Sequence, residues 1–445
     1  MASDLFNIGL SGLRASRAAL DLTAQNIANA GTEGYVRRSL RVSEVGSAGT
    51  WLAPGDLTLS GVRIDGVTRN ADLFRQAEVR RTGSDSARAA EELGGYENIE
   101  AALEQSGLFP AMTAFESALQ RLESNPVDPA LRAGALEDGR TLARSFNLAS
   151  GSLDTLGEGL RFAATAGTQD VNTYAAELAR VNLQLSRAAT GSSDQTMLLD
   201  RRDTLLQQIA TKVGISTSYG PDQSVTVRIG SSSGPVLVTA GTTQPFAMTT
   251  AADGTIGFTL AGSAVALSSG QLAGQAQGLI GVRDRKAELD GIANSLITAA
   301  NAAQAGGVAL DGSPGQPLFA GSGAGGITLA LASGAGLATA PAGAGAGSRD
   351  PANLAALRNA LDGAGVTDRI DSLMFGAASA ASARRTTADA LDSIAGAARI
   401  ALAEQAGVSL DDEAANLLRF QQAFQASGRV IQVASDLFDT LLAIR

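Results

Sequence analysis

The C-terminal end of the chain repeats large apolar side chains at heptad spacing, and this pattern restricts the end to one kind of structure. A seam of this kind fits a long helix that packs along another helix. Ser409 is a suitable N-cap, and Asp411, Asp412 and Glu413 would place negative charge at the positive end of the helix dipole. The seam consists of Leu410, Leu417, Phe424, Ile431 and Phe438, with Phe420 and Leu441 three residues after members of that series.

The N-terminal end carries the same spacing, which predicts a helix over residues 4–28. Residues that tolerate left-handed conformations follow it, so we expect the helix to stop there and the chain to change direction. The N-terminal seam is Phe6, Leu13, Leu20 and Ile27, and the turn motif is Asn26, Asn29, Gly34 and Tyr35.

Neither end carries enough apolar surface to hold its shape alone. Burying four side chains of this size contributes about 6–12 kcal/mol, whereas fixing the backbone costs about 1–2 kcal/mol per residue. Isolated helices of this length are marginal in water. We therefore expect the two ends to become ordered only against each other and against neighbouring subunits. The alternative, an ordinary long helix packed into the chain's own core, is left open by the spacing.

Between the ends the hydrophobic period changes twice. Helical spacing covers residues 71–213, strand-like alternation covers 215–270, and helical spacing returns over 278–304, 353–361 and 368–405. Helix interruptions are expected near Gly94–Gly95, at Phe109–Pro110 and between Leu160 and Val171. The pattern predicts a mainly α fold, multidomain and α+β, with terminal helices forming a coiled-coil layer, a central helical bundle and a small antiparallel β insertion.

The expected domains are nested. Residues 1–34 and 406–445 form a discontinuous coiled-coil domain for assembly. Residues 35–213 and 277–405 form a discontinuous helix-rich domain, and residues 214–276 form the small antiparallel β domain.

Composition excludes several classes of function. The chain contains no histidine and no cysteine, which removes imidazole bases, thiolate ligands and disulfides. A net charge of −10 opposes binding to nucleic acid. No secretory signal and no apolar run long enough to span a bilayer stand out, so we expect no membrane partner. We predict no catalytic, cofactor-binding or metal-binding residue.

Two short motifs match catalytic patterns by chance. Residues 230–234 read G-x-S-x-G but lie between two strand-like runs, which favours a polar hairpin over a nucleophile elbow. Residues 321–326 read G-x-G-x-x-G, but a strand-like segment follows where a dinucleotide site needs a helix.

Both ends carry the residues of a known family. SGLRASRAALDLTAQNIANAGTEGYVRR, Ser11 to Arg38, resembles the N-terminal signature of the bacterial flagellar axial family, which comprises rod, hook and hook-associated proteins. GVSLDDEAANLLRFQQAFQASGRVIQVASDLFDTLLAIR, Gly407 to Arg445, is similar to the C-terminal signature of the same family. The segment NAAQAGGVALDGSPGQPLF, Asn301 to Phe319, looks like the hook-associated branch.

This resemblance implies a secreted, extracellular structural subunit of the bacterial flagellum at the junction of hook and filament. It implies export through the flagellar type III apparatus and self-assembly into a ring or helical layer. The implied partners are the hook protein, hook-associated protein 3 and a FlgN-type export chaperone at the C-terminal region. The alternatives are a hook or rod protein, hook-associated protein 3 itself, or a secreted protein with a hydrolytic or adhesive middle domain.

Overall fold

The structure, a computed structural model, describes residues 2–32, 34–46 and 59–443. The chain forms two compact units. Unit 1 comprises Met1–Asp85, Asp170–Phe246 and Asp392–Arg445, and unit 2 comprises Ser86–Gln169 and Ala247–Leu391. Three long helices contribute residues to both units, namely α2 (Leu73–Gln105), α4 (Pro129–Leu185) and α9 (Val366–Ala406).

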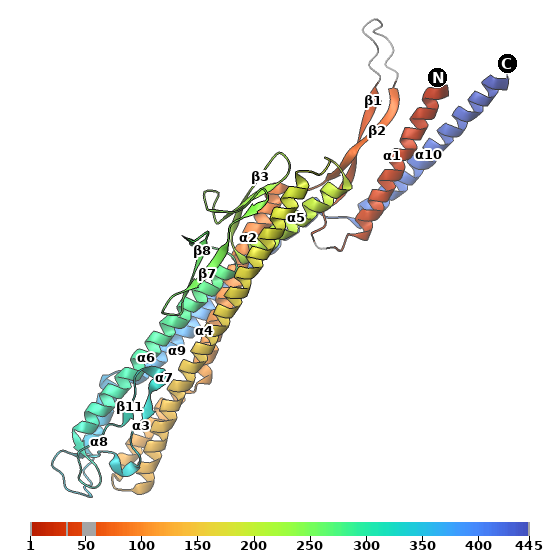
Figure 1. Ribbon diagram of the computed structural model, residues 1–445. Coiled ribbons are helices and arrows are strands. Elements are labelled where there is room, and N and C mark those ends of the chain that lie inside the picture. The colour runs from red at the N-terminus through yellow and green to blue at the C-terminus, as the bar shows by residue number, and fades with distance from the viewer. Residues whose placement is uncertain (1, 33, 47–58, 444–445) are drawn as a thin grey trace. The chain divides into compact units, whose positions relative to one another are not determined.

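In unit 1 the two ends of the chain lie side by side. Helix α1 (Ala2–Ala28) pairs with α10 (Leu410–Ala443), and the labelled termini lie at the same end of this pair (Figure 1). Two antiparallel strands, β1 (Arg38–Gly46) and β2 (Leu59–Arg69), also pack against α1. The chain therefore leaves α1 through a short turn and enters a hairpin that returns along the same helix.

Unit 1 also holds a helix and a four-stranded antiparallel sheet. Helix α5 (Ser193–Lys212) precedes strands β3 (Ile215–Tyr219), β4 (Val225–Ile229), β5 (Val236–Thr239) and β6 (Thr242–Thr243), which pair in chain order. The G-x-S-x-G segment joins β4 to β5, where a Cβ on Gly234 would lie 2.0 Å from the carbonyl oxygen of Ile229. The predicted polar hairpin is confirmed.

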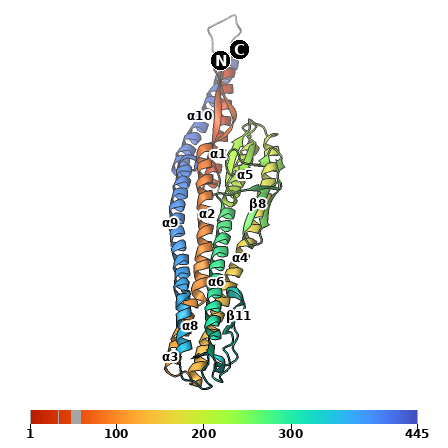
Figure 2. The ribbon, with the colours of Figure 1, turned by 90° about the vertical axis from the view of Figure 1, so that its left-hand side faces the viewer.

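Unit 2 is a helical bundle with a continuous apolar core. The unit 2 parts of α2, α4 and α9 pack with α3 (Leu108–Ser124), α6 (Gln271–Ala305) and α8 (Ala352–Gly363), and α2 runs between α9 and α6 in Figure 2. Phe115 and Phe319 meet edge to face within this core, with ring centroids 6.0 Å apart. Leucine and alanine supply most of the remaining buried side chains.

A three-stranded sheet begins at the end of unit 1 and continues in unit 2. It contains β7 (Phe246–Thr250), β8 (Ile256–Leu260) and β9 (Ser263–Val265), paired in chain order. The predicted turn at Asp253–Gly254 joins β7 and β8, and the Asp253 carboxylate accepts hydrogen bonds from the backbone and the hydroxyl of Thr255.

The Gly- and Ala-rich segment after α6 is held by polar side chains of the bundle. Arg132 of α4 is buried and donates to the carbonyls of Gly334 and Leu337 at 3.0 and 2.8 Å and to the Thr339 hydroxyl at 2.7 Å. Asn301 of α6 bonds to the backbone of Leu318 and Phe319. The segment contains β10 (Gly307–Val308), β11 (Phe319–Ala320), α7 (Gly323–Gly326), β12 (Thr328–Leu329), the 3₁₀ turn Gly334–Gly336 and β13 (Ala340–Pro341).

The expected fold class is confirmed, but two of the predicted interruptions are wrong and one is shifted. Helix α2 continues through Gly94–Gly95. A Cβ on Gly95 would lie 3.1 Å from Cα of Gly278, so this glycine allows α2 and α6 to approach closely and does not interrupt the helix. Helix α4 is continuous from Leu160 to Val171, since Ala164, Thr168 and Val171 keep one buried face. The break expected at Phe109–Pro110 falls earlier, at Ser106–Gly107, and Pro110 occupies the first turn of α3, where a backbone donor has no helical partner.

The division into nested domains at residues 34, 213, 276 and 405 stays a prediction. None of the helices within the described residues has an apolar stretch long enough to cross a membrane.

Candidate functional site

The two terminal helices pair antiparallel in a single register. A Cβ on Gly9 would lie 2.7 Å from Cγ1 of Ile431, and a Cβ on Gly12 would lie 2.9 Å from Oγ of Ser427. Near the other end, Asn26 Nδ2 lies 3.3 Å from Glu413 Oε2. Residue numbers rise along α1 as they fall along α10 across these contacts. Because the glycines leave no room for a side chain, the helices meet through small residues and come close together.

The heptad residues of α1 are not the residues that it buries most deeply. Ser16, Ala19, Leu22 and Thr23 are buried along α1, together with Asn26. By contrast, the seam residues Leu13 and Leu20 are only half-buried, and Phe6 and Ile27 are exposed.

The heptad residues of α10 divide in the same way. Leu410, Phe424 and Phe438 are 56%, 36% and 57% exposed, while Leu417, Phe420 and Ile431 are half-buried. Leu441 lies within α10, but its side chain is outside the described residues. Further apolar side chains of α10 are exposed beside the seam, namely Leu418, Val430, Val433 and Leu437. We call the exposed set, Leu410, Leu418, Phe424, Val430, Val433, Leu437 and Phe438, the open face of α10.

The turn motif after α1 converges on Asn26. Its Oδ1 accepts hydrogen bonds from the Tyr35 hydroxyl at 2.9 Å and from the Arg38 amide at 3.1 Å, and its Nδ2 donates to the Arg38 carbonyl at 2.9 Å. Gly34 takes a φ of +79° between them. Asn29 is separate, since its side chain bonds back to the carbonyl of Gln25 on the surface. Burial raises the pKa of the Tyr35 hydroxyl, so Tyr35 remains a hydrogen-bond donor.

Glu413 ties the start of α10 to this turn. Its side chain is 2% exposed, and its carboxylate contacts Arg37 Nε at 2.7 Å and Asn26. For Asp411, Asp412 and Glu413 the sequence favoured helix-start electrostatics over contact with a chaperone or a neighbouring subunit. That reading fits the exposed pair Asp411 and Asp412 but misses the role of Glu413. No local signal could have revealed it, because its partners lie more than 370 residues away.

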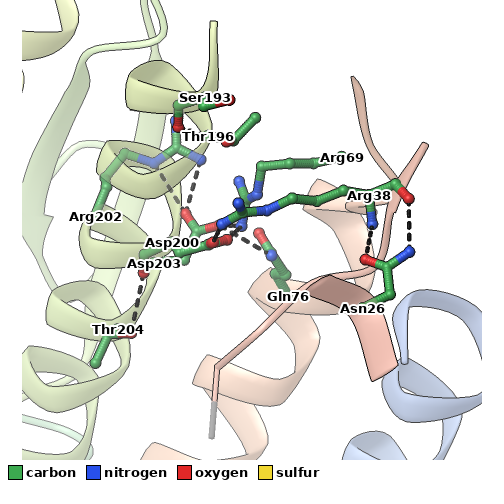
Figure 3. A network of polar contacts seen from close by, with 10 residues as sticks. All are labelled: Asn26, Arg38, Arg69, Gln76, Ser193, Thr196, Asp200, Arg202, Asp203 and Thr204. Atoms are coloured by element: carbon green, nitrogen blue, oxygen red, sulfur yellow. Dashed lines mark hydrogen bonds and ion pairs between the residues drawn. The ribbon is translucent and has the colours of Figure 1, made fainter. Parts of the chain in front are cut away.

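A second polar cluster joins the hairpin to α5. Arg38 Nη2 contacts Asp200 Oδ2 at 2.5 Å, and Arg69 Nη2 lies 2.8 Å from Asp200 Oδ1 and 2.9 Å from Asp203 Oδ2 (Figure 3). Asp203 also accepts hydrogen bonds from Gln76 of α2 and from Arg202. Sequence reasoning identified none of these residues as functional.

The electrostatics of this cluster favour an ionised Asp203. Burial disfavours the charged form of Asp203, but Arg202 and Arg69 outweigh burial, and the pKa of Asp203 is held below its ordinary value. Arg202 is itself buried, lies 4.8 Å from the ring centroid of Tyr219 and donates to the Gln223 carbonyl. The arrangement fixes elements relative to one another and offers no unpaired acid for proton transfer.

We call the two clusters together the polar junction: Asn26, Tyr35, Arg37, Arg38 and Glu413 with Arg69, Gln76, Asp200, Arg202 and Asp203. Arg38 belongs to both clusters, since its backbone bonds to Asn26 and its side chain to Asp200. The junction thus links the terminal helix pair to α5.

A cavity of about 600 Å³ lies beside the polar junction. It is lined by the turn after α1, by α2 and α5, and by the end of α9, and among the described residues of that lining Asp203 is the one carboxylate. Among the described residues, no group of three or more acidic side chains is placed to hold a metal ion.

Three family models match this chain. The model described as the helical domain of flagellar hook-associated protein FlgK matches residues 94–319. The model of the flagella basal body rod protein matches residues 6–35, and the model of the C-terminal part of the flagellar basal body rod FlgEFG protein matches residues 401–444. The two rod models coincide with α1 and its turn and with α10.

Curated relatives carry one name. Flagellar hook-associated protein 1 of Bacillus subtilis is 25% identical over 487 residues, covering 97% of this chain and 96% of that protein. The proteins of the same name from Salmonella typhimurium and Escherichia coli are each 29% identical over 254 residues, covering 55% of this chain. The match spans about half the length of these two relatives, 44% and 45%.

Similarity also extends to a solved structure. The flagellar hook junction protein FlgK of Burkholderia pseudomallei is 22% identical, with a TM-score of 0.49, over 55% of this chain and 47% of that one.

Proposed function

The chain belongs to the family of the flagellar hook-associated protein FlgK, and from that premise we propose that it is hook-associated protein 1, a structural subunit of the junction between hook and filament. The relative from Bacillus subtilis, which aligns with nearly the whole chain, supports this assignment over a hook or rod protein. The match of the FlgK helical domain to α2 through α6 supports it as well.

The observation that carries the proposal is the open face of α10. Seven large apolar side chains lie exposed on one terminal helix, although α10 is already paired with α1. Large apolar side chains exposed in this number along one helix indicate a protein contact. Burying the exposed half of each side chain contributes about 1 kcal/mol, so the face as a whole offers about 7 kcal/mol towards association.

In this proposal the terminal helices assemble and the rest of the chain is presented outside them. The seam residues act through neighbours: Phe6, Leu13, Leu20 and Ile27 on α1, and Leu410, Leu417, Phe420, Phe424, Ile431, Phe438 and Leu441 on α10. The turn motif Asn26, Asn29, Gly34 and Tyr35 redirects the chain from that layer into the hairpin. The subunits form a ring or helical layer in contact with the hook protein and hook-associated protein 3.

Export and location follow from the same proposal. The chain leaves the cell unfolded through the flagellar type III apparatus, and a FlgN-type chaperone covers the C-terminal region beforehand. Because the open face of α10 stays exposed until assembly, a chaperone bound there would protect the apolar side chains from other contacts. The protein acts outside the cell, as a structural part and not as an enzyme.

The test is complementation of a strain that lacks the gene. Electron microscopy of the deletion strain should show hooks without filaments, with flagellin released into the medium. A strain without hooks would instead indicate a hook or rod protein. The wild-type gene should restore filaments, and Phe424→Asp should not, although its purified chain should remain folded.

The matched control is Phe162→Asp on α4. It places the same charge at an exposed phenylalanine of unit 2, whereas the terminal helices belong to unit 1. The control should restore filaments. Normal filaments on the Phe424→Asp strain would refute the role of the open face.

A further inference from the structure

The two arginines at the base of the hairpin oppose each other directly. Arg38 of β1 is the register partner of Arg69 of β2. Residues paired in this way share one face of the ladder, with their Cβ atoms about 4.5–5.5 Å apart, and like charges so placed are destabilising. The two side chains are only 10% and 4% exposed, so water screens little of the repulsion.

Asp200 lies where it can neutralise this pair. One carboxylate oxygen contacts Arg38 at 2.5 Å and the other contacts Arg69 at 2.8 Å, so a single side chain of α5 bridges both strands. Asp203, one turn further along α5, takes a second contact with Arg69. Figure 3 shows both arginines extended from the hairpin towards these two carboxylates.

We propose that the β1–β2 hairpin is charge-frustrated at its base and closes only as it docks on α5, with Asp200 as the residue that permits closure. Hairpin formation and docking are then one step. Asn26 holds both the amide and the carbonyl of Arg38. The same step therefore positions the end of α1, and Asp200 acts as a positioning residue for the terminal helix pair.

A charge-independent contact lies further along the hairpin. The Val67 amide donates to the Gly191 carbonyl at 3.0 Å, and a Cβ on Gly66 would lie 3.0 Å from Cα of Gly191. Backbone thus meets backbone just before α5. Because this contact does not involve Asp200, loss of the carboxylate should loosen the base of the hairpin without removing every docking contact.

Hydrogen exchange on the purified full-length chain tests the proposal. In the wild type the amides of β1 and β2 should be protected. Asp200→Asn should lower their protection by about tenfold or more, as loss of a buried charge-assisted contact predicts, and leave the core helices of unit 2 unchanged. Unaltered protection of the hairpin would overturn the proposal.

A second variant separates frustration from the simple loss of an ion pair. Arg69→Thr removes the opposing charge, so Asp200→Asn combined with Arg69→Thr should protect the hairpin better than Asp200→Asn alone. If the carboxylate merely contributed contacts, the double variant would be no better than the single one, and that result would also overturn the proposal. Should Asp200→Asn fail to fold, recovery of folding in the double variant is the same test.

The control is Asp170→Asn. Its carboxylate is 44% exposed and pairs with Lys212 at 3.1 Å, away from the hairpin. Exchange in the hairpin should match the wild type. These measurements need no flagellum, so they stand or fall independently of the proposed junction role.

Discussion

Glu413 and Asn26 lie at opposite ends of the chain and touch: Nδ2 of Asn26 is 3.3 Å from Oε2 of Glu413, and both side chains are buried. The contact joins the first turn of α10 to the last turns of α1. Arg37 completes it from the other side of the carboxylate. These contacts mark the polar end of the terminal pair, whereas Gly9 and Gly12 bring the helices close together further along it.

Replacing Glu413 should loosen the terminal pair at this end. Glu413→Ala removes a buried carboxylate that accepts two hydrogen bonds, and because Arg37 stays partly in water we expect a local loss of about 1–3 kcal/mol. Hydrogen exchange in the first turns of α10 should rise accordingly. Asp411→Ala, an exposed neighbour in the same turn, should change exchange by about 0.5 kcal/mol at most.

The register of α1 and α10 can be trapped by cysteine pairs, because the chain has no cysteine of its own. Gly9/Ile431 and Gly12/Ser427 set the alignment, which places Ser16 opposite Ala423. Ser16→Cys with Ala423→Cys should therefore form a disulfide readily under mild oxidation. Ser16→Cys with Phe420→Cys, displaced by about one turn, should do so poorly. Adding Gly9→Val should suppress the first disulfide, since its side chain collides with Ile431; efficient crosslinking despite that collision would contradict the register.

Asp203→Asn should flatten the acid dependence of stability. The folded-state pKa of Asp203 is lowered, with Arg202 and Arg69 outweighing burial. Such a group contributes stability above its unfolded-state pKa, about 3.9, and the contribution is lost as the pH falls through the lower folded-state pKa. Urea midpoints should show the variant weaker than the wild type at neutral pH and the gap narrowing below about pH 4. A gap that stays constant with pH would assign the effect to something other than ionisation.

Adjacent glycines in α2 should respond in opposite directions. A Cβ on Gly95 meets Cα of Gly278, whereas nothing lies within 4 Å of a Cβ on Gly94. Gly94→Leu should raise the free energy of unfolding by about 0.5–1 kcal/mol through helix propensity. Gly95→Leu should lower it by about 1–3 kcal/mol through overpacking. Thermal unfolding of the two variants beside the wild type measures both, and a stabilising effect of Gly95→Leu would show that α2 and α6 are not in close contact there.

Local chemistry made much of the fold predictable. The expected N-cap is found, with the Ser409 hydroxyl accepting from the Asp412 amide, and helix α5 ends at Lys212, where the sequence predicts a change from helical to strand-like spacing. The alternation over 215–270 correctly indicated antiparallel strands. These features depend on near neighbours, which a single sequence displays.

The failures share a cause, since each depends on a partner distant in sequence. Gly95 looked like a helix breaker because the sequence does not display Gly278 beside it. The assembly role of the heptad residues stays a prediction, but the spacing does not reveal that α1 meets α10 through Gly9, Gly12 and Ser427. It also does not show that Phe424 and Phe438 remain exposed on the paired helix. Asp200 and Glu413 look like ordinary surface acids until Arg38 and Arg37 are placed against them.

The antiparallel pairing of the two ends also bears on how the rest of the chain can vary. Asn26 and Glu413 are 387 positions apart and in contact, so the residues between them form one long loop whose two ends meet. Doubling the length of such a loop adds only about 0.6 kcal/mol to the entropic cost of closing it. Outer segments can therefore be gained or shed at little thermodynamic cost, while the geometry at the point of closure stays the same.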